Sequence, residues 1–176
     1  LIPRGVMSDI VTSFLPHWQQ TRLWVLARPL SGFAETFSHY LVETAPSGGS
    51  TAPDDDAGAH SVLFVVAGSL RLTLDGTAHD LEAGGYAYIP PGMDWQAANV
   101  GGEHVLFHWI RKRYQAVAGI GTPPTFVTSD AAITPIEMPD CGGVWATTRF
   151  VDPADLRHDM HVNIVTFQPG GRIPFA

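Results

Sequence analysis

The chain has 176 residues, room for one sizeable domain or for one domain and part of another. Apolar residues make up 45% and charged residues 15%, which excludes wholesale disorder and allows a buried core. A net charge of −7, with ten dispersed basic residues, argues against nucleic acid or an anionic membrane surface as a partner. No apolar run is long enough to span a membrane and no signal-peptide pattern opens the chain, so we expect a cytoplasmic protein.

The predicted strands are short and are separated by turn residues. Residues 61–66 form a mostly apolar run, and residues 69–75 alternate apolar and polar side chains as a half-buried strand does. Asp75-Gly76 then predicts a type I′ hairpin turn, and a further apolar run follows at residues 105–110. Eighteen glycines and 14 prolines are scattered between these runs. Short strands at this spacing predict a β-sandwich or a β-barrel.

A glycine- and proline-rich motif specifies which barrel is expected. The sequence that begins at Gly84 is Gly-Gly-Tyr-Ala-Tyr-Ile-Pro-Pro-Gly-Met-Asp-Trp-Gln-Ala-Ala-Asn and ends at Asn99. It resembles the second conserved cupin motif, in which Gly, Pro-x-Gly, His and Asn have the same spacing. The glycines permit turns with positive φ, and the prolines end a strand over residues 86–89. The motif predicts an all-β fold, a cupin double-stranded β-helix or jelly-roll barrel, with Trp95 at the histidine position.

The other positions at which cupin barrels carry metal ligands also lack the usual ligand side chains in this sequence. The family glutamate position corresponds to Ser61, and the two histidine positions lie within residues 54–57. Asp54–Asp56 could bind a hard cation, but their Pro- and Gly-flanked context predicts a solvated loop. His60 is nearby but out of phase. We therefore predict no catalytic, cofactor-binding or metal-binding residue in this barrel, and we expect Trp95 to point inward where a histidine ligand would lie.

The remaining histidines are interpreted as structural or surface residues, and the single cysteine as incidental. His158 and His161 are three residues apart, and in a strand over residues 160–167 such positions point to opposite faces. His104 and His108 share one face of a strand, without an acidic or cysteine partner at ligand spacing. Because Cys141 is the only cysteine of the chain, no internal disulfide can form. It lies in a turn-like Pro-Asp-Cys-Gly-Gly segment without a paired histidine.

Two landmarks recur along the chain at a distance of about 120 residues, which indicates an internal repeat. The segment Trp24-Val-Leu-Ala-Arg is followed later by Trp145-Ala-Thr-Thr-Arg, and residues 40–49 correspond to residues 163–171. Each copy is a predicted strand, rich in β-branched and apolar residues, that is followed by a Pro/Gly turn. At the same offset, the counterparts of residues 54–99 fall beyond Ala176. The second unit is therefore expected to contain only the first strands of a second barrel.

The chain as a whole resembles the bicupin (S)-ureidoglycine aminohydrolases. The features that carry the resemblance are the ligand-less first barrel, the Trp/Arg repeat, Arg111-Lys-Arg-Tyr at the barrel exit and residues 150–163. The segment from Trp145 to Ala176 is the most specific part, because generic cupins do not share it. The resemblance implies hydrolysis of ureidoglycine to ureidoglycolate and ammonia in allantoin catabolism, a branch of purine degradation.

The resemblance also implies where the chemistry takes place. In that family the catalytic Mn²⁺ is held by the C-terminal cupin, on a Glu-x-His-x-x-x-His run and a later Gln, and this run is expected immediately after Ala176. Catalytic and metal residues are therefore expected beyond this chain, which holds the non-catalytic half and is expected to be inactive alone. We expect no cofactor bound to it and a small-molecule substrate for the full-length protein.

These interpretations give a domain plan and two alternative functions. The plan is an N-terminal arm (1–22), a metal-free cupin barrel (23–113), a linker with little regular structure (114–143) and the first strands of a C-terminal cupin (144–176). The alternatives are a metal-free cupin that acts as a ligand-binding or sensor module, and a different metal-dependent bicupin such as a dioxygenase.

A homo-oligomer is expected in addition. Aromatic residues precede the core strands, and apolar surface of that kind is typical of an interface. The residues are Trp18, Trp24, Phe33 and Phe37.

Overall fold

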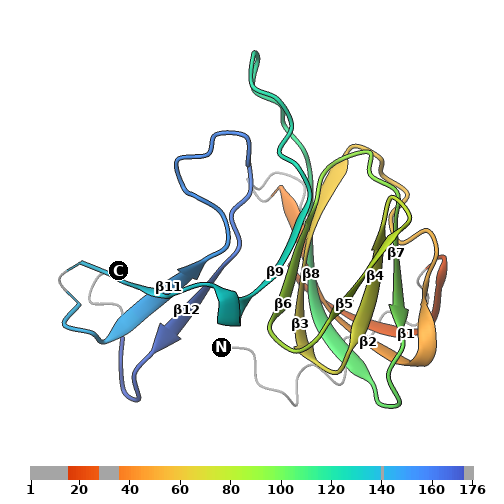
Figure 1. Ribbon diagram of the computed structural model, residues 1–176, viewed down its shortest axis with the longest axis horizontal. Helices are drawn as coiled ribbons and strands as arrows, with labels where there is room; N and C mark the ends of the chain where they lie inside the picture. Colours follow the sequence, from red (N-terminus) through yellow and green to blue (C-terminus); the bar gives the residue numbers. More distant parts are fainter. Residues whose placement is uncertain (1–15, 28–35, 140, 173–176) are drawn as a thin grey trace.

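The computed structural model describes residues 16–27, 36–139 and 141–172 (Figure 1). Within these residues every regular element is a strand except one short 3₁₀ helix, and no helix is long and apolar enough to cross a membrane. The all-β prediction is confirmed. The elements are β1 (Trp18–Ala27), β2 (Phe37–Ser50), β3 (Ala59–Ala67), β4 (Leu70–Leu74), β5 (Thr77–Leu81), β6 (Gly85–Ile89), β7 (Trp95–Asn99), β8 (Val105–Arg113), β9 (Phe126–Ser129), η1 (Asp130–Ala132), β10 (Ile136–Glu137), β11 (Trp145–Arg149) and β12 (Asn163–Phe167).

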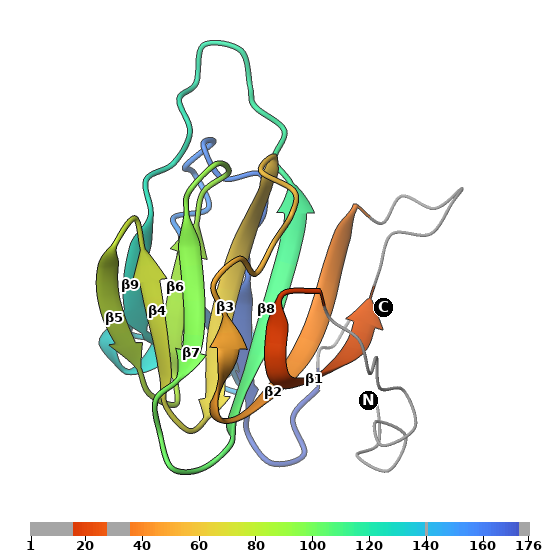
Figure 2. The same ribbon diagram turned by 90° about the vertical axis from the view of Figure 1, so that its right-hand side faces the viewer.

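Nine strands form one sheet that curves into a nearly closed barrel (Figures 1 and 2). The order is β5-β4-β7-β2-β8-β3-β6-β9, with β1 paired to β2. Strand β2 joins the two faces, because residues 37–44 pair with β8 whereas Gly49 and Ser50 pair with β7. A Cβ at Gly49 would lie 2.2 Å from the Ala97 carbonyl oxygen, so the crossing requires glycine there. The predicted cupin barrel is confirmed.

The strands at the centre of the sheet are buried on both faces. On β3, Leu63 and Val65 point into the barrel, whereas Val62 belongs to a second cluster on the outer face. The ring of Phe150 covers that outer face and stacks on Tyr86, with ring centroids 3.9 Å apart. Two-sided burial explains why residues 61–66 form a continuous apolar run and not an alternating pattern.

The turns follow the sequence prediction. Asp75 and Gly76 both have positive φ, 44° and 81°, as the predicted type I′ turn requires. Gly84 has a φ of 89° and donates its N–H to the Val65 carbonyl at 2.8 Å, which connects the turn before β6 to the end of β3. The cupin motif thus specifies where the chain reverses direction.

Part of the predicted linker belongs to the barrel. Strand β9 pairs with β6 and extends the sheet at its edge. Val127 packs against the barrel core and Phe126 stacks on Tyr86 and Tyr88. The expectation of little regular structure over residues 114–143 is therefore wrong for this segment, because tertiary packing stabilises a strand of only four residues. At the other end, β1 begins at Trp18, inside the expected arm.

The repeat is visible in topology but not in register. Both copies form consecutive antiparallel strands, β1 with β2 and β11 with β12. In the first pair Trp24 is opposite Leu41, whereas in the second pair Trp145 is opposite Phe167, which corresponds to Thr44 in the first copy. Strands β10, β11 and β12 form a separate three-stranded sheet beside the barrel (Figure 1). That this sheet begins a second barrel stays a prediction.

Asn99, the last residue of the motif, connects the end of β7 to β2 and to the turn before β8. Its side-chain amide donates to the carbonyls of Thr44 and Glu103, both at 2.8 Å, and its Oδ1 accepts the N–H of Gly101 at 2.9 Å. The Asn99 side chain is buried, and its bond to Thr44 is buried as well, so the Thr44 carbonyl would lose its partner without access to water if Asn99 were truncated.

We expect Asn99→Ala to lower the free energy of unfolding by about 2–4 kcal/mol, because it leaves the buried Thr44 carbonyl unpaired and removes two further hydrogen bonds. Urea denaturation measures the change. The control is Gln96→Ala, at an exposed position of the same strand, which should stay within about 0.5 kcal/mol of the parent. An Asn99→Ala protein as stable as the control would contradict this role.

Candidate functional site

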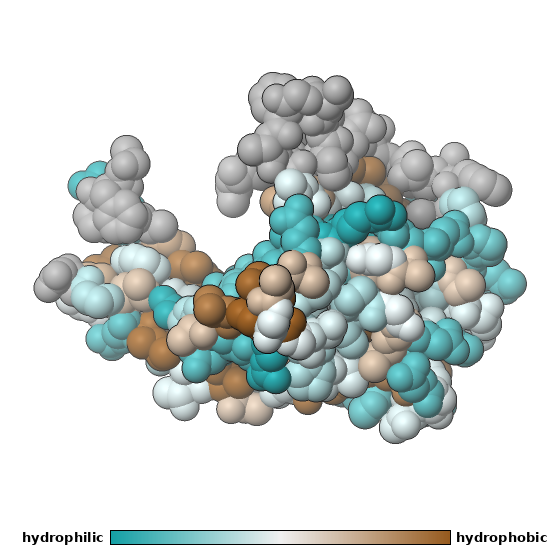
Figure 3. Space-filling model, turned by 90° about the horizontal axis from the view of Figure 1, so that it is seen from above, coloured by the Kyte–Doolittle hydropathy of each residue, from teal (hydrophilic) through white to brown (hydrophobic). Residues whose placement is uncertain are grey.

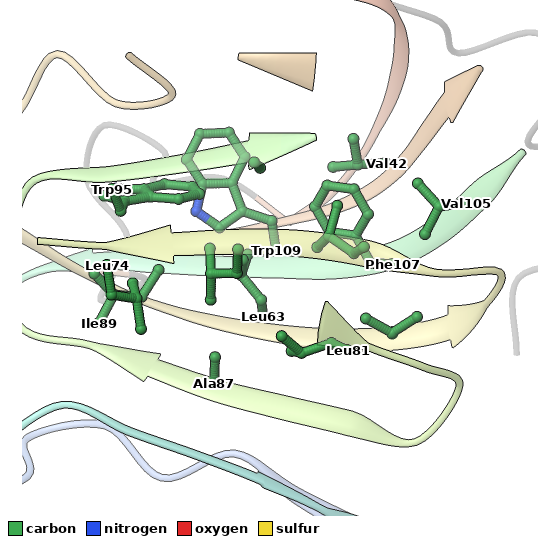
Figure 4. Packing of buried hydrophobic residues seen from close by; sticks show 14 of the residues in the cluster. Val42, Leu63, Leu74, Leu81, Ala87, Ile89, Trp95, Val105, Phe107 and Trp109 are labelled. Carbon is green, nitrogen blue, oxygen red and sulfur yellow. The ribbon is translucent and has the colours of Figure 1, made fainter. Parts of the chain in front are cut away.

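The barrel interior is filled by apolar side chains, among them the aromatic rings of Trp95, Phe107 and Trp109 (Figure 4). Trp95 is 7% exposed and packs edge-on against Trp109, with ring centroids 5.8 Å apart. The indole N–H of Trp109 donates to the Ser61 hydroxyl at 3.0 Å. The prediction that Trp95 points into the barrel is therefore confirmed. Ser61, at the family glutamate position, serves as the hydrogen-bond acceptor of a core tryptophan.

The residues at the ligand positions do not fit a divalent metal. Asp54, Ser61 and Trp95 all line one small pocket of about 130 Å³. Asp56 and Asp94 line the same pocket, but Asp54 and Asp56 are each paired with an arginine, and none of the described histidines lines it, whereas Zn²⁺ takes about four and Ca²⁺ about six to eight donor atoms. Among the residues that the structure describes, no group of three or more His, Cys, Asp or Glu side chains could hold a metal ion. The described residues of the first barrel therefore do not fit the metal that its fold family implies.

A partly buried ion pair lies at the mouth of the barrel. Arg111 is opposite Ser61 on β3, and its Nη2 lies 2.6 Å from Oδ1 of Asp54. The Asp54 side chain is only 7% exposed, so the expectation of a solvated loop is wrong at this residue. Burial raises the pKa of Asp54, against the lowering effects of the Asp56 N–H and of Arg111. The guanidinium carbon of Arg111 also lies 5.8 Å from the Trp109 ring centroid.

The two other aspartates of this loop lie nearer to solvent. Asp55 is exposed, and its Oδ1 lies 3.2 Å from Nε2 of His17. Asp56 forms an ion pair with Arg113, whose side chain is 77% exposed. The three adjacent aspartates therefore have three different environments, which their common sequence context does not distinguish.

Aromatic side chains form the walls of the mouth. Asp54 and Arg111 line an open pocket of about 620 Å³ together with Trp18, Tyr40 and Trp109. Trp18 packs 5.7 Å from Trp109, and its indole N–H donates to the Pro53 carbonyl at 3.2 Å. Trp18, expected at an oligomer interface, thus belongs to the barrel wall.

The other aromatic residues expected at an oligomer interface leave that expectation open. Trp24 is half-buried on β1 and Phe37 is 37% exposed. Phe33 lies outside the described residues. The homo-oligomer stays a prediction.

A second polar cluster lies on the outer face of the barrel. His60 is fully buried, with Nδ1 3.1 Å from the Tyr88 hydroxyl and Nε2 2.8 Å from Oδ1 of Asp159. The other Asp159 oxygen accepts a hydrogen bond from Lys112 at 2.8 Å. His60 is thus out of phase with the barrel interior, as predicted, and instead joins the barrel to the segment before β12. Burial lowers the pKa of His60 to about 4, even though Asp159 opposes that shift.

His158 and His161 lie near each other, with ring centroids 6.4 Å apart, and Asp155 Oδ2 lies 3.9 Å from Nε2 of His158, but these side chains do not form a group that could hold a metal ion. His158 is buried edge-on against Tyr88, whereas His161 is exposed. The strand that was expected to contain His161 begins only at Asn163. His104 is exposed just before β8.

His108 packs against a residue that the sequence reasoning missed. Nδ1 of His108 lies 2.9 Å from Nε2 of His39, and burial lowers the pKa of His39 to about 4. The signal in the sequence was the position of His39 beside a predicted strand, which did not indicate its partner on β8. Cys141 is half-buried in its turn and donates its thiol to the Trp145 carbonyl.

Residues 40–111 match the Cupin domain family. This chain contains a cupin domain. It is 28% identical to (S)-ureidoglycine aminohydrolase from Escherichia coli (strain K12) over 171 residues, which are 97% of this chain and 62% of that protein. The resemblance predicted from the sequence is therefore confirmed, and the chain spans about three fifths of this relative's length.

Solved structures also match this chain over nearly its whole length. The putative glyoxylate induced protein from Pseudomonas aeruginosa matches with a TM-score of 0.92 and 62% identity, over 99% of this chain and 66% of that chain. Protein Ylba from E. coli matches with a TM-score of 0.81 and 25% identity, over 94% of this chain and 63% of that chain. The polyketide cyclase RemF from Streptomyces resistomycificus, at 19% identity and a TM-score of 0.53, shares the fold alone.

We expect Trp95→Ala to lower the free energy of unfolding by about 3–5 kcal/mol, because it opens a cavity in the barrel interior. Chemical denaturation measures the loss. Val100→Ala, at a position 46% exposed, is the control and should change stability by less than about 0.5 kcal/mol. If both variants melt like the parent, Trp95 is not part of a packed core.

We also expect the buried His60 to make stability depend on pH. Its folded-state pKa of about 4 lies below the ordinary value of 6.5, so the unfolded state takes up the proton first as the pH falls. The stabilisation is fully present above pH 6.5 and is lost between pH 6.5 and pH 4, by about 3 kcal/mol at most. His60→Gln should flatten this part of the stability profile in urea melts. An unchanged profile would show that His60 does not titrate with unfolding.

Proposed function

We propose that this chain is the metal-free barrel portion of a (S)-ureidoglycine aminohydrolase. The observation that carries the proposal is the length of the similarity. The E. coli enzyme matches 97% of the chain, including the three-stranded sheet and the segment before it, whereas the cyclase that shares only the cupin fold matches 71%. Residues outside the cupin match at 40–111 therefore support a relationship closer than the fold alone.

The proposed reaction consumes one water and releases one ammonia. Water adds to the α-carbon of ureidoglycine as its amine leaves, and ureidoglycolate is the product. We place the catalytic centre, with Mn²⁺, in a second cupin formed by residues beyond Ala176, because the first barrel has too few donor side chains. When bound, such a cation would anchor the substrate carboxylate and help orient a base.

The barrel described above has a supporting role in this proposal. Its outer face holds the segment that leads into β12, through the Tyr86–Phe150 stack and through Lys112, which donates to both the carbonyl and the carboxylate of Asp159. Contacts of this kind would position the strands that begin the second barrel. We extend the proposal to a cytoplasmic homo-oligomer that acts on a small-molecule substrate.

The test is an ammonia-release assay with ureidoglycine on two proteins, the natural full-length protein and residues 1–176 alone, each with and without a chelator. We expect chelator-sensitive activity from the full-length protein that Mn²⁺ restores, and none from residues 1–176. Turnover by residues 1–176 would place the active site in this barrel. A full-length protein that does not release ammonia would refute the proposed activity, and activity unaffected by the chelator would refute the metal.

A further inference from the structure

We propose that the mouth of this barrel binds a neutral, planar group that carries a carbonyl oxygen beside an N–H, such as a primary amide or a urea. The site is the pocket lined by Asp54, Arg111 and the aromatic walls described above. The inference goes beyond the proposed function and stands or falls independently of it, because it concerns binding by this chain and not the activity of the full-length protein.

The shape of the pocket fits a small flat molecule. Its volume of about 620 Å³ lies within the roughly 300–1,000 Å³ typical of ligand sites. Tyr40 and Trp18 both pack against Trp109, with ring centroids 5.4 and 5.7 Å from that ring. Leu23 and Val25 complete an apolar lining. Such walls favour a planar ligand that buries apolar surface against the rings.

The polar groups of the pocket present a donor beside an acceptor. Arg111 has five N–H donors, and its hydrogen bond within the described part of the chain uses Nη2 alone. On Asp54, Oδ1 accepts from both Arg111 and the Asp56 N–H. Oδ2 has no hydrogen bond to any residue that the structure describes. An amide can therefore accept from the guanidinium and donate to this second oxygen without breaking the ion pair.

The charges at the mouth exclude the simpler alternatives. An anion that accepts from the free N–H groups of Arg111 would lie beside the Asp54 carboxylate and would also face Asp55, which is 74% exposed at the rim. A cation that donates to Oδ2 of Asp54 would lie beside the Arg111 guanidinium. Either ligand would meet a like charge in a partly buried site, which is costly. A neutral group that both donates and accepts avoids this cost.

The chain offers a matched control for this pair. Arg113 and Asp56 form a second Arg–Asp ion pair that also lines the pocket. Their side chains are 77% and 29% exposed, compared with 26% and 7% for Arg111 and Asp54. Because hydrogen bonds are stronger where water is excluded, the buried pair should determine ligand recognition and the rim pair should contribute little.

The experiment uses three probes of one shape, benzamide, benzoate and benzamidine, which carry respectively one acceptor and one donor group, two acceptors, and two donors. Each is titrated into the 176-residue chain and followed by calorimetry and by tryptophan fluorescence. We expect benzamide to bind at least about tenfold more tightly than either charged probe. Tighter binding of benzoate or benzamidine, or no saturable binding of benzamide below about 10 mM, would overturn the proposal without any variant.

Two pairs of variants then locate the site, each checked for a parent-like circular dichroism spectrum. Arg111→Met and Asp54→Asn should each weaken benzamide at least about tenfold, and Asp54→Asn should also reduce the discrimination against benzoate. Arg113→Met and Asp56→Asn should leave benzamide affinity within about twofold. Equal losses of benzamide affinity in both pairs of variants would contradict the proposal, because the charges at the rim and not the Arg111–Asp54 pair would then govern binding. If Arg111→Met or Asp54→Asn does not fold, the relative affinities of the three probes for the parent chain decide whether the proposal holds.

Discussion

The packing of Trp109 is the interaction on which the rest of this barrel depends. Its ring contacts Trp95 and Trp18, and its N–H is bonded to Ser61. These contacts fill the interior where a cupin metal site would need open space and convergent ligands. Apolar burial stabilises the interior in place of metal coordination. The polar side chains of this region, Arg111 and Asp54, form an ion pair at the mouth of the barrel.

The outer face explains how the barrel relates to the segment that follows it. On the outer face of the barrel Phe150 packs with the buried Val62 and Tyr86, and the surface seen from above carries hydrophobic residues near the middle of the molecule (Figure 3). His60 and Lys112 both contact Asp159 in the segment between β11 and β12. A strand that is apolar on both faces needs such a cover. The barrel and residues 150–164 are therefore best understood as one packed structure, and the end of β8 is not a boundary between independent parts.

The sequence predicted the fold well because its signals are local. Alternation in residues 69–75, the Asp75-Gly76 turn and the Gly84–Asn99 motif each act over a few residues, and each element formed as expected. The sequence did not predict β9, the burial of Asp54 or the His39–His108 contact, because each depends on a partner far along the chain. For Asp54 the missing information was the position of Arg111, which only the pairing of β3 with β8 provides.

The central claim is that aromatic packing has replaced the metal site of this barrel, and a titration of the 176-residue chain with Mn²⁺ tests it most directly. Calorimetry and thermal melts with and without Mn²⁺ are the measurements. We predict no saturable heat and an unchanged Tm, because an ion that does not bind the folded state cannot stabilise it. One-to-one binding with a raised Tm, both lost in Asp54→Asn, would contradict the claim and place a metal beside Trp95.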